Sequence, residues 1–148
     1  MNNRGFTLVE LLAVLAIIAI IGMIAVPNVI SIVDNNKKDL MLQDAQKMVS
    51  LAKAEVMKDR VFRDDPTKTE ITYKLRDLDT KDVLKEDPDG GTYNLDSYVK
   101  YKKATGGSGT SGYCVYLAGS KRTIKAGKAN SNCVSEENLS NRTYVFDN

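Results

Sequence analysis

The distribution of apolar residues divides the chain into two unlike parts. Between Leu11 and Val26 no side chain is polar, and the apolar character extends from Phe6 to Val33 with few interruptions. A helix over this segment would be roughly 42 Å long, more than the ~30 Å hydrocarbon core of a bilayer. The pattern therefore predicts a helix that either spans a membrane or is buried among other apolar helices.

The pattern becomes amphipathic after Val33, while the helix is expected to continue. Apolar residues recur at intervals of three and four positions, and most charged residues fall elsewhere on the helical wheel. The recurring apolar residues are Met41, Ala45, Met48, Ala52 and Val56. We predict one helix over about 6–60, apolar all round in its first half and with one face for a sheet to cover in its second half.

The remainder of the chain has the pattern of a small antiparallel sheet. A helix stop is expected at Asp64-Asp65-Pro66, a short helix capped by Asp79 or Thr80 is expected to end near Glu86, and turn residues follow. Short segments rich in Tyr, Val and Thr are separated by Gly, Ser and Asn clusters, among them a glycine-rich loop at 106–112. The predicted strands are about 92–95, 98–103, 113–117, 123–126 and 143–146. The predicted fold class is α+β, with a long N-terminal helix packed on a small antiparallel β-sheet.

Composition excludes several kinds of catalytic site. The chain has 148 residues, no His, no Trp and two Cys. These numbers exclude a Ser–His–Asp triad, a Cys–His dyad, a His-ligated metal site and a four-ligand Cys/His zinc site. No other catalytic grouping is visible, so we expect no enzyme, no cofactor and no metal. The 21 basic and 19 acidic residues give a net charge of +2, which by itself does not indicate a nucleic-acid binder.

A short motif precedes the apolar run. Gly5-Phe6-Thr7-Leu8-Val9-Glu10-Leu11-Leu12 closely resembles the N-terminal motif of type IV pilins and their relatives, the pseudopilins and competence pilins. A cleaved secretory signal fits less well, because the apolar run is too long and no small-x-small cleavage site follows. A plain single-pass anchor would not explain a carboxylate at Glu10, which is costly in an apolar helix. The resemblance implies cleavage by prepilin peptidase between Gly5 and Phe6, and N-methylation of Phe6.

The resemblance also gives Glu10 a role in assembly. Cleavage would create a cationic α-amine at Phe6, and opposite charges attract strongly where water is excluded. We predict that Glu10 pairs with the Phe6 amine of an adjacent subunit. The alternative is a pair within one chain, since positions i and i+4 share a helix face.

Gly22 and Pro27 interrupt the apolar half. Proline lacks an N–H, and its ring crowds the carbonyl four residues earlier, here that of Met23. A kink or an unwound stretch is expected near 22–27, although glycine and proline are also tolerated in membrane helices. We expect a bend in the subunit, or local melting of the helix when it packs in a filament.

The resemblance implies a structural function. It predicts a leader at 1–5, a membrane or filament-core helix at 6–33, its amphipathic half at 34–60, and a globular head at 61–148. The subunit would wait in the bacterial cytoplasmic membrane, N-terminus inside, and an assembly platform would polymerise it into a surface filament for adhesion, motility, biofilm formation or DNA uptake. The alternatives are a pseudopilin or competence pilin and, in another class, a single-pass anchored binding domain.

Two cysteines lie in the part that the resemblance places outside the cytoplasm. Many pilins close their C-terminal region with one disulfide, and the oxidising surroundings favour such a bond. We therefore predict a Cys114–Cys133 disulfide. Two reduced, buried thiols are the alternative.

Basic residues are concentrated in 98–130, where no acidic residue occurs. They are Lys100, Lys102, Lys103, Lys121, Arg122, Lys125 and Lys128. With the interleaved tyrosines they form a candidate surface for DNA or another anionic ligand, such as a host surface. A solvated sheet face, or contacts between oppositely charged faces of neighbouring subunits, is the simpler interpretation. Asp87-x-Asp89-Gly90 resembles the start of a Ca²⁺ loop but lacks the remaining ligands, so a plain turn is favoured.

Overall fold

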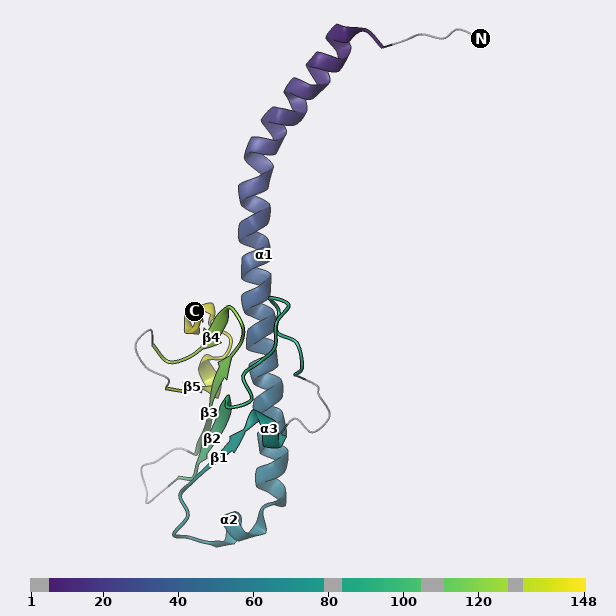
Figure 1. Ribbon diagram of the computed structural model, residues 1–148. Helices are drawn as coiled ribbons and strands as arrows, with labels where there is room; N and C mark the ends of the chain where they lie inside the picture. The colour runs from purple at the N-terminus through teal and green to yellow at the C-terminus, as the bar shows by residue number, and fades with distance from the viewer. Residues whose placement is uncertain (1–5, 79–83, 105–110, 128–131) are drawn as a thin grey trace. The chain divides into compact units, whose positions relative to one another are not determined.

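The computed structural model describes residues 6–78, 84–104, 111–127 and 132–148 (Figure 1). The chain forms two compact units, with the boundary between Asn36 and Lys37. One helix, α1 (Leu8–Lys58), contributes to both units. The predicted long helix is therefore confirmed, and it begins and ends two residues inside the predicted range.

The first unit is the apolar half of α1. Its large apolar side chains, from Leu8 to Val33, are between 47% and 79% exposed. By length and composition this helix can cross a membrane. So much exposed apolar surface is far more than a soluble monomer normally presents, and it requires a lipid or protein environment.

The helix is continuous through Gly22 and Pro27. The unwound stretch expected as one alternative near 22–27 is therefore not present in this subunit. The side chain of Asn28 donates a hydrogen bond from Nδ2 to the carbonyl oxygen of Ile24, at 3.0 Å, just where proline disturbs the backbone ladder. Melting of the helix upon assembly stays a prediction.

The second unit combines the amphipathic half of α1 with a sheet that covers one of its faces (Figure 1). The predicted apolar stripe is buried, together with Leu42 and Val49. On the sheet side, Val99, Val115, Leu117 and Ile124 are completely buried against it. Because side chains alternate between the two faces of a strand, these residues define the face of the sheet that packs on the helix.

All strand pairs in the sheet are antiparallel. The strand order is β1-β2-β3-β4-β6, and β5 pairs with β3. The strands are β1 (Glu70–Lys74), β2 (Tyr98–Lys102), β3 (Gly112–Ala118), β4 (Arg122–Ile124), β5 (Val134–Ser135) and β6 (Val145–Asp147). The remaining elements are two short helices, α2 (Arg60–Asp64) and α3 (Leu75–Leu78), and the 3₁₀ turns η1 (Glu136–Asn138) and η2 (Arg142–Tyr144).

The predicted strands at 98–103, 113–117 and 123–126 correspond to β2, β3 and β4, so the α+β fold class is confirmed. The predicted strand at 92–95 is wrong. Tyr93 is buried there with its hydroxyl on Asp44, and Asn94 forms a turn in which its Oδ1 accepts from the backbone N–H of Asp96. The predicted strand at 143–146 is half 3₁₀ turn and half β6. The predicted short helix before Glu86 and most of the glycine-rich loop lie outside the described residues.

Candidate functional site

The N-terminus of α1 is closed by a reciprocal pair of side chains. Thr7 donates from its backbone N and from Oγ1 to Oε2 of Glu10, at 2.8 and 2.9 Å. In return, the backbone N–H of Glu10 donates to Oγ1 of Thr7 at 3.3 Å. The Thr7 carbonyl also accepts from the backbone N–H of Leu11. This arrangement is a capping box, in which Thr7 is the N-cap and Glu10 stands three residues later.

The capping box gives Glu10 a partner within its own chain that the sequence prediction missed. The sequence does contain a signal for this capping box, because Thr7-x-x-Glu10 ahead of an apolar run is the capping-box pattern. Both hydrogen bonds reach the same oxygen, Oε2, and among the described residues Oε1 accepts none. Phe6 is 88% exposed and directly precedes the N-cap residue Thr7. Gly5 lies outside the described residues.

The same segment carries the likeness to known proteins. Residues 1–26 match the family model described as the prokaryotic N-terminal methylation motif, which is the class III signal peptide of type IV pilins and their relatives. Over these first 26 residues the chain is therefore similar to type IV pilins and pseudopilins, and the motif supports a pilin-like class of structural protein. Comparison with curated proteins and with solved structures finds no match.

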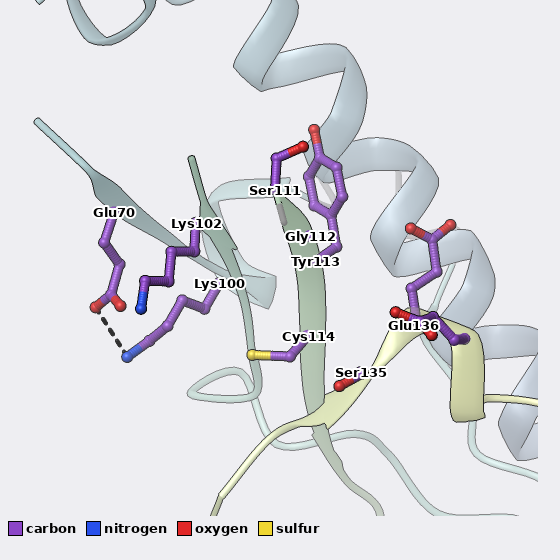
Figure 2. Close-up of a pocket in the computed structure, with 10 residues that line it drawn as sticks. Glu70, Lys100, Lys102, Ser111, Gly112, Tyr113, Cys114, Ser135 and Glu136 are labelled. Carbon is purple, nitrogen blue, oxygen red and sulfur yellow. Dashed lines mark ion pairs between the residues drawn. The ribbon is translucent and has the colours of Figure 1, made fainter. Parts of the chain in front are cut away.

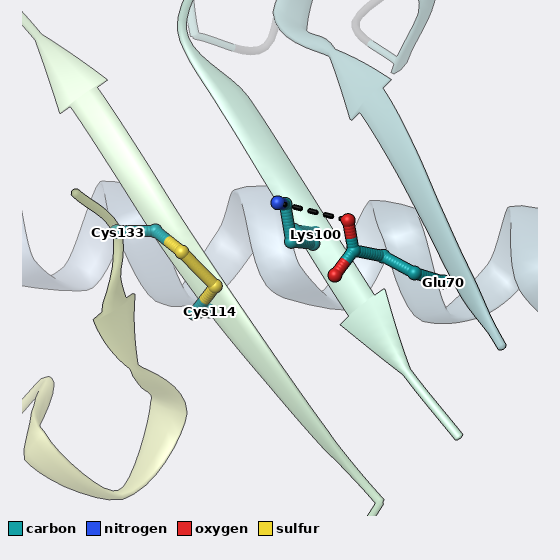
Figure 3. Close-up of a disulfide and its surroundings, with 4 residues drawn as sticks. All are labelled: Glu70, Lys100, Cys114 and Cys133. Atoms are coloured by element: carbon teal, nitrogen blue, oxygen red, sulfur yellow. Dashed lines mark ion pairs between the residues drawn. A yellow bond between two sulfur atoms is a disulfide. The ribbon is translucent and has the colours of Figure 1, made fainter. Parts of the chain in front are cut away.

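Cys114 and Cys133 form a disulfide, as predicted (Figure 3). Cys114 lies in β3, and Cys133 directly precedes β5, the strand that pairs with β3. The two Cα atoms are 5.2 Å apart, and the residues are separated by 19 positions in the sequence. The bond therefore ties the C-terminal part of the chain to the centre of the sheet.

The structure gives three of the predicted basic residues partners within the chain. Lys100 pairs with Glu70 on the neighbouring strand, with Nζ 2.9 Å from Oε1 (Figure 3). Lys103 donates to the carbonyl oxygens of Phe62 and Asp65 at the C-terminal end of α2. Arg122 pairs with Asp89 and with Asp147. These side chains satisfy internal groups, which favours the interpretation of this region as an ordinary sheet surface.

Among the described residues, the other predicted basic residues do not gather into a single cluster. Lys102 and Lys121 are exposed, Lys125 lies 5.8 Å from the centre of the Phe146 ring, and Lys128 is outside the described residues. Lys100 and Lys102 line a surface pocket of about 340 Å³ beside Gly112 (Figure 2). Glu70, Glu136 and Glu137 also line it, so the pocket combines both signs of charge and does not select for an anion.

A tight turn at Asp87–Gly91 packs against the β3–β4 connection. Oδ1 of Asp87 accepts from the backbone N–H groups of Asp89 and Gly91, and Oδ2 accepts from the backbone N–H of Ser120 at 2.6 Å. Burial disfavours the charged form of Asp87, but these hydrogen bonds outweigh it and hold its pKa below the usual carboxyl value. Gly90 has φ +84, and a Cβ at Gly91 would collide with Ser120, so glycine is required at both positions.

Polar side chains connect the second half of α1 to the loops and the C-terminal segment. Tyr93 donates its hydroxyl to Asp44 at 2.8 Å, and burial together with this hydrogen bond raises the pKa of Tyr93 well above its usual value. Further along the chain, Glu136 pairs with Lys53 and Arg142 pairs with Asp39 through two hydrogen bonds of 2.5 Å. No sequence pattern pointed to these pairs, because their members are far apart in the chain.

Proposed function

We propose that the chain is the structural subunit of a type IV pilus. In this proposal prepilin peptidase cleaves it after Gly5, Phe6 is N-methylated, and an assembly platform polymerises it through α1 into a surface filament. The observation that carries the proposal is the methylation motif at 1–26 joined to an apolar half-helix whose large side chains are 47–79% exposed. Such a surface is stable only in lipid or against other apolar helices.

The proposal assigns consecutive roles along the chain. Residues 1–5 are the leader, 6–33 anchor the subunit in the cytoplasmic membrane and later form the filament core, 34–60 connect to the head, and 61–148 form the head outside. The disulfide between Cys114 and Cys133 supports an oxidising location for the head. Adhesion, motility, biofilm formation and DNA uptake are the activities that such a filament would serve.

Glu10 is the proposed assembly residue, and its capping box makes the idea testable. The box uses one carboxylate oxygen, which leaves the negative charge and Oε1 for the Phe6 amine of a neighbouring subunit. Glu10→Gln keeps an oxygen that accepts from Thr7, because glutamine also serves in a capping box, but it removes the charge. Thr7→Val keeps the charge but removes the side-chain cap, which costs about 1 kcal/mol of helix stability.

We expect Glu10→Gln to reduce or abolish filaments while the amount of membrane-bound subunit is unchanged, and Thr7→Val to retain filaments. The measurement is the yield of subunit in sheared surface fractions against the total cellular amount. Normal filament yield from Glu10→Gln would contradict the assembly role. Loss in Thr7→Val alone would instead assign the role to the cap.

A pseudopilin or competence pilin is the nearest alternative, because the same motif occurs in those relatives. A single-pass anchored binding domain that never polymerises is the alternative of a different class. Mass spectrometry of sheared surface filaments distinguishes a pilus subunit from an anchored domain. A pilus subunit is abundant there, begins at methylated Phe6 and contains the disulfide, whereas an anchored domain stays with the membrane as a single copy.

A further inference from the structure

Tyrosines face one another across the β2–β3 strand pair on both sides of the sheet. Tyr98 lies directly opposite Tyr116, and Tyr101 lies directly opposite Tyr113. Because side chains alternate along a strand, the first pair lies on the outer face of the sheet and the second on the face directed towards α1. The ring centroids are 5.4 Å apart in the first pair and 4.5 Å apart in the second, so the second pair is the closer one.

The strand register suits this second pair for a reaction between its rings. Residues directly opposite each other in an antiparallel pair have Cβ atoms about 4.5–5.5 Å apart, and their side chains stand roughly perpendicular to the sheet. The phenol rings of Tyr101 and Tyr113 therefore lie side by side at the same height above their strands. Tyr93 contrasts with them, because it is only 4% exposed and its hydroxyl donates to Asp44.

The closer pair is packed by its neighbours but is still open to water. The rings of Phe62 and Tyr101 meet edge to face, with centroids 6.0 Å apart, and Nζ of Lys53 lies 5.4 Å from the centre of the Tyr113 ring. Both tyrosines are half-buried, and Tyr113 lines the surface pocket beside Gly112 (Figure 2). Burial raises the pKa of Tyr113, and the neighbouring phenol of Tyr101 adds to this, so Tyr113 keeps its proton at neutral pH. Water in the pocket is available to accept that proton when the ring is oxidised.

The composition of the chain makes tyrosine its main one-electron donor. The side chains that lose a single electron most readily are the phenol of tyrosine, the indole of tryptophan and the thiol of cysteine. The chain has seven tyrosines and no tryptophan, and its two cysteines are joined in the disulfide. No indole or free thiol of the chain therefore competes with the tyrosines for a one-electron oxidant.

We propose that Tyr101 and Tyr113 form a modification site, at which a one-electron oxidant driven by a peroxide joins the two rings into a dityrosine. Each phenol loses one electron and its phenolic proton. The two phenoxyl radicals couple through a carbon ortho to each oxygen, and the hydrogens displaced from these carbons restore the hydroxyl groups. The chain loses two hydrogen atoms overall, and the peroxide accepts the two electrons and two protons as its O–O bond breaks.

The cross-link would complement the disulfide. The disulfide ties β3 to the segment that leads into β5, whereas the new carbon–carbon bond would tie β3 to β2 on its other side. Reducing agents cleave the first bond and not the second. The proposal does not depend on whether the chain polymerises.

The test uses the full-length chain, diluted in detergent and oxidised briefly by a light-activated ruthenium complex with persulfate as the peroxide. We expect a monomeric product that has the fluorescence of dityrosine and is lighter than the starting chain by two hydrogen atoms. Peptide mapping should join the β2 peptide to the β3 peptide through Tyr101 and Tyr113. Tyr113→Phe and Tyr101→Phe should each lose this product. Tyr116→Phe, the same conservative change in the wider pair, should retain it.

Several results would overturn the proposal. One is the absence of monomeric dityrosine from the wild type under conditions that couple free tyrosine. Another is a cross-link that maps to Tyr98 and Tyr116, or a yield that Tyr113→Phe leaves unchanged. Equal yields from the folded chain and from the chain unfolded in urea would show that the fold does not bring the two rings together for this reaction.

Discussion

At the scale of single residues, hydrogen bonding decides the charge state of groups that burial alone would neutralise. Asp87 is 6% exposed, yet its pKa is lowered because three backbone N–H groups donate to its carboxylate. The sequence indicated a turn here from its proline and glycines, and that turn is present. It did not indicate which backbone would donate to Asp87, because Ser120 is brought there only by the pairing of β3 and β4.

The lowered pKa of Asp87 predicts how stability depends on pH. Its contribution is fully present above the ordinary carboxyl pKa of about 3.9, and it is lost as the pH falls through the lower value of the folded state. We expect Asp87→Asn to be less stable than the wild type at pH 7, with a difference that shrinks as the pH falls below about 4. Thermal midpoints of both proteins between neutral and acidic pH measure this, and a constant difference would contradict the assignment.

At the scale of elements, periodicity predicted the helix and the central strands, because both are defined by repeating buried positions. The stripe through Met41, Ala45 and Met48 is buried where a period of 3.6 places it. Strand β1 was missed because only Ile71 and Tyr73 of its five residues turn inward, and both are half-buried. The segment at 92–95 has strand-forming residues, but Asn94 makes only one backbone hydrogen bond to Ala118 and one turn hydrogen bond with Ser97, not the repeated pairs of a ladder.

The disulfide acts at this same scale, because it fixes β5 and the segment after it to β3. Closing a loop of this length contributes roughly 3 kcal/mol through the lost freedom of the unfolded chain. We expect Cys114→Ser/Cys133→Ser to lower the free energy of unfolding by about 2–4 kcal/mol. Denaturant unfolding of oxidised wild type and the double variant measures the difference. An equal stability of the two would mean that strand pairing alone holds the segment.

At the scale of the whole molecule, two units of different character share one helix. In the described part of the first unit, residues 6–36, no side chain is buried, whereas the unit from Lys37 onward buries a continuous apolar cluster. The sequence made this division visible through the change from an all-apolar to an amphipathic pattern. The interactions that complete the second unit, such as Lys37 with Asp89, join residues far apart in the chain and could not be predicted from local patterns.

A deletion tests this division. We expect a chain that begins at Asn35 to remain in solution without detergent and to keep the disulfide, because the buried apolar cluster lies entirely after that point. Size-exclusion chromatography and free-thiol labelling are the measurements, with the full-length chain as the control. Aggregation of the shortened chain in water would show that the first unit contributes to folding of the second.

The two ion pairs that connect the C-terminal segment to α1 have a mechanical consequence. Asp39 and Lys53 stand fourteen residues apart on the helix, about 21 Å along its axis, and their partners Arg142 and Glu136 follow in the opposite order. Each exposed pair contributes little by itself, about 0–1 kcal/mol. A force along the axis of α1, however, would load both ion pairs at the same time, in shear. The C-terminal segment that carries Glu136 and Arg142 is itself fixed to the sheet by the disulfide at Cys133. The two ion pairs would therefore resist a force along the helix axis together, whereas a force perpendicular to the axis would break them one after the other.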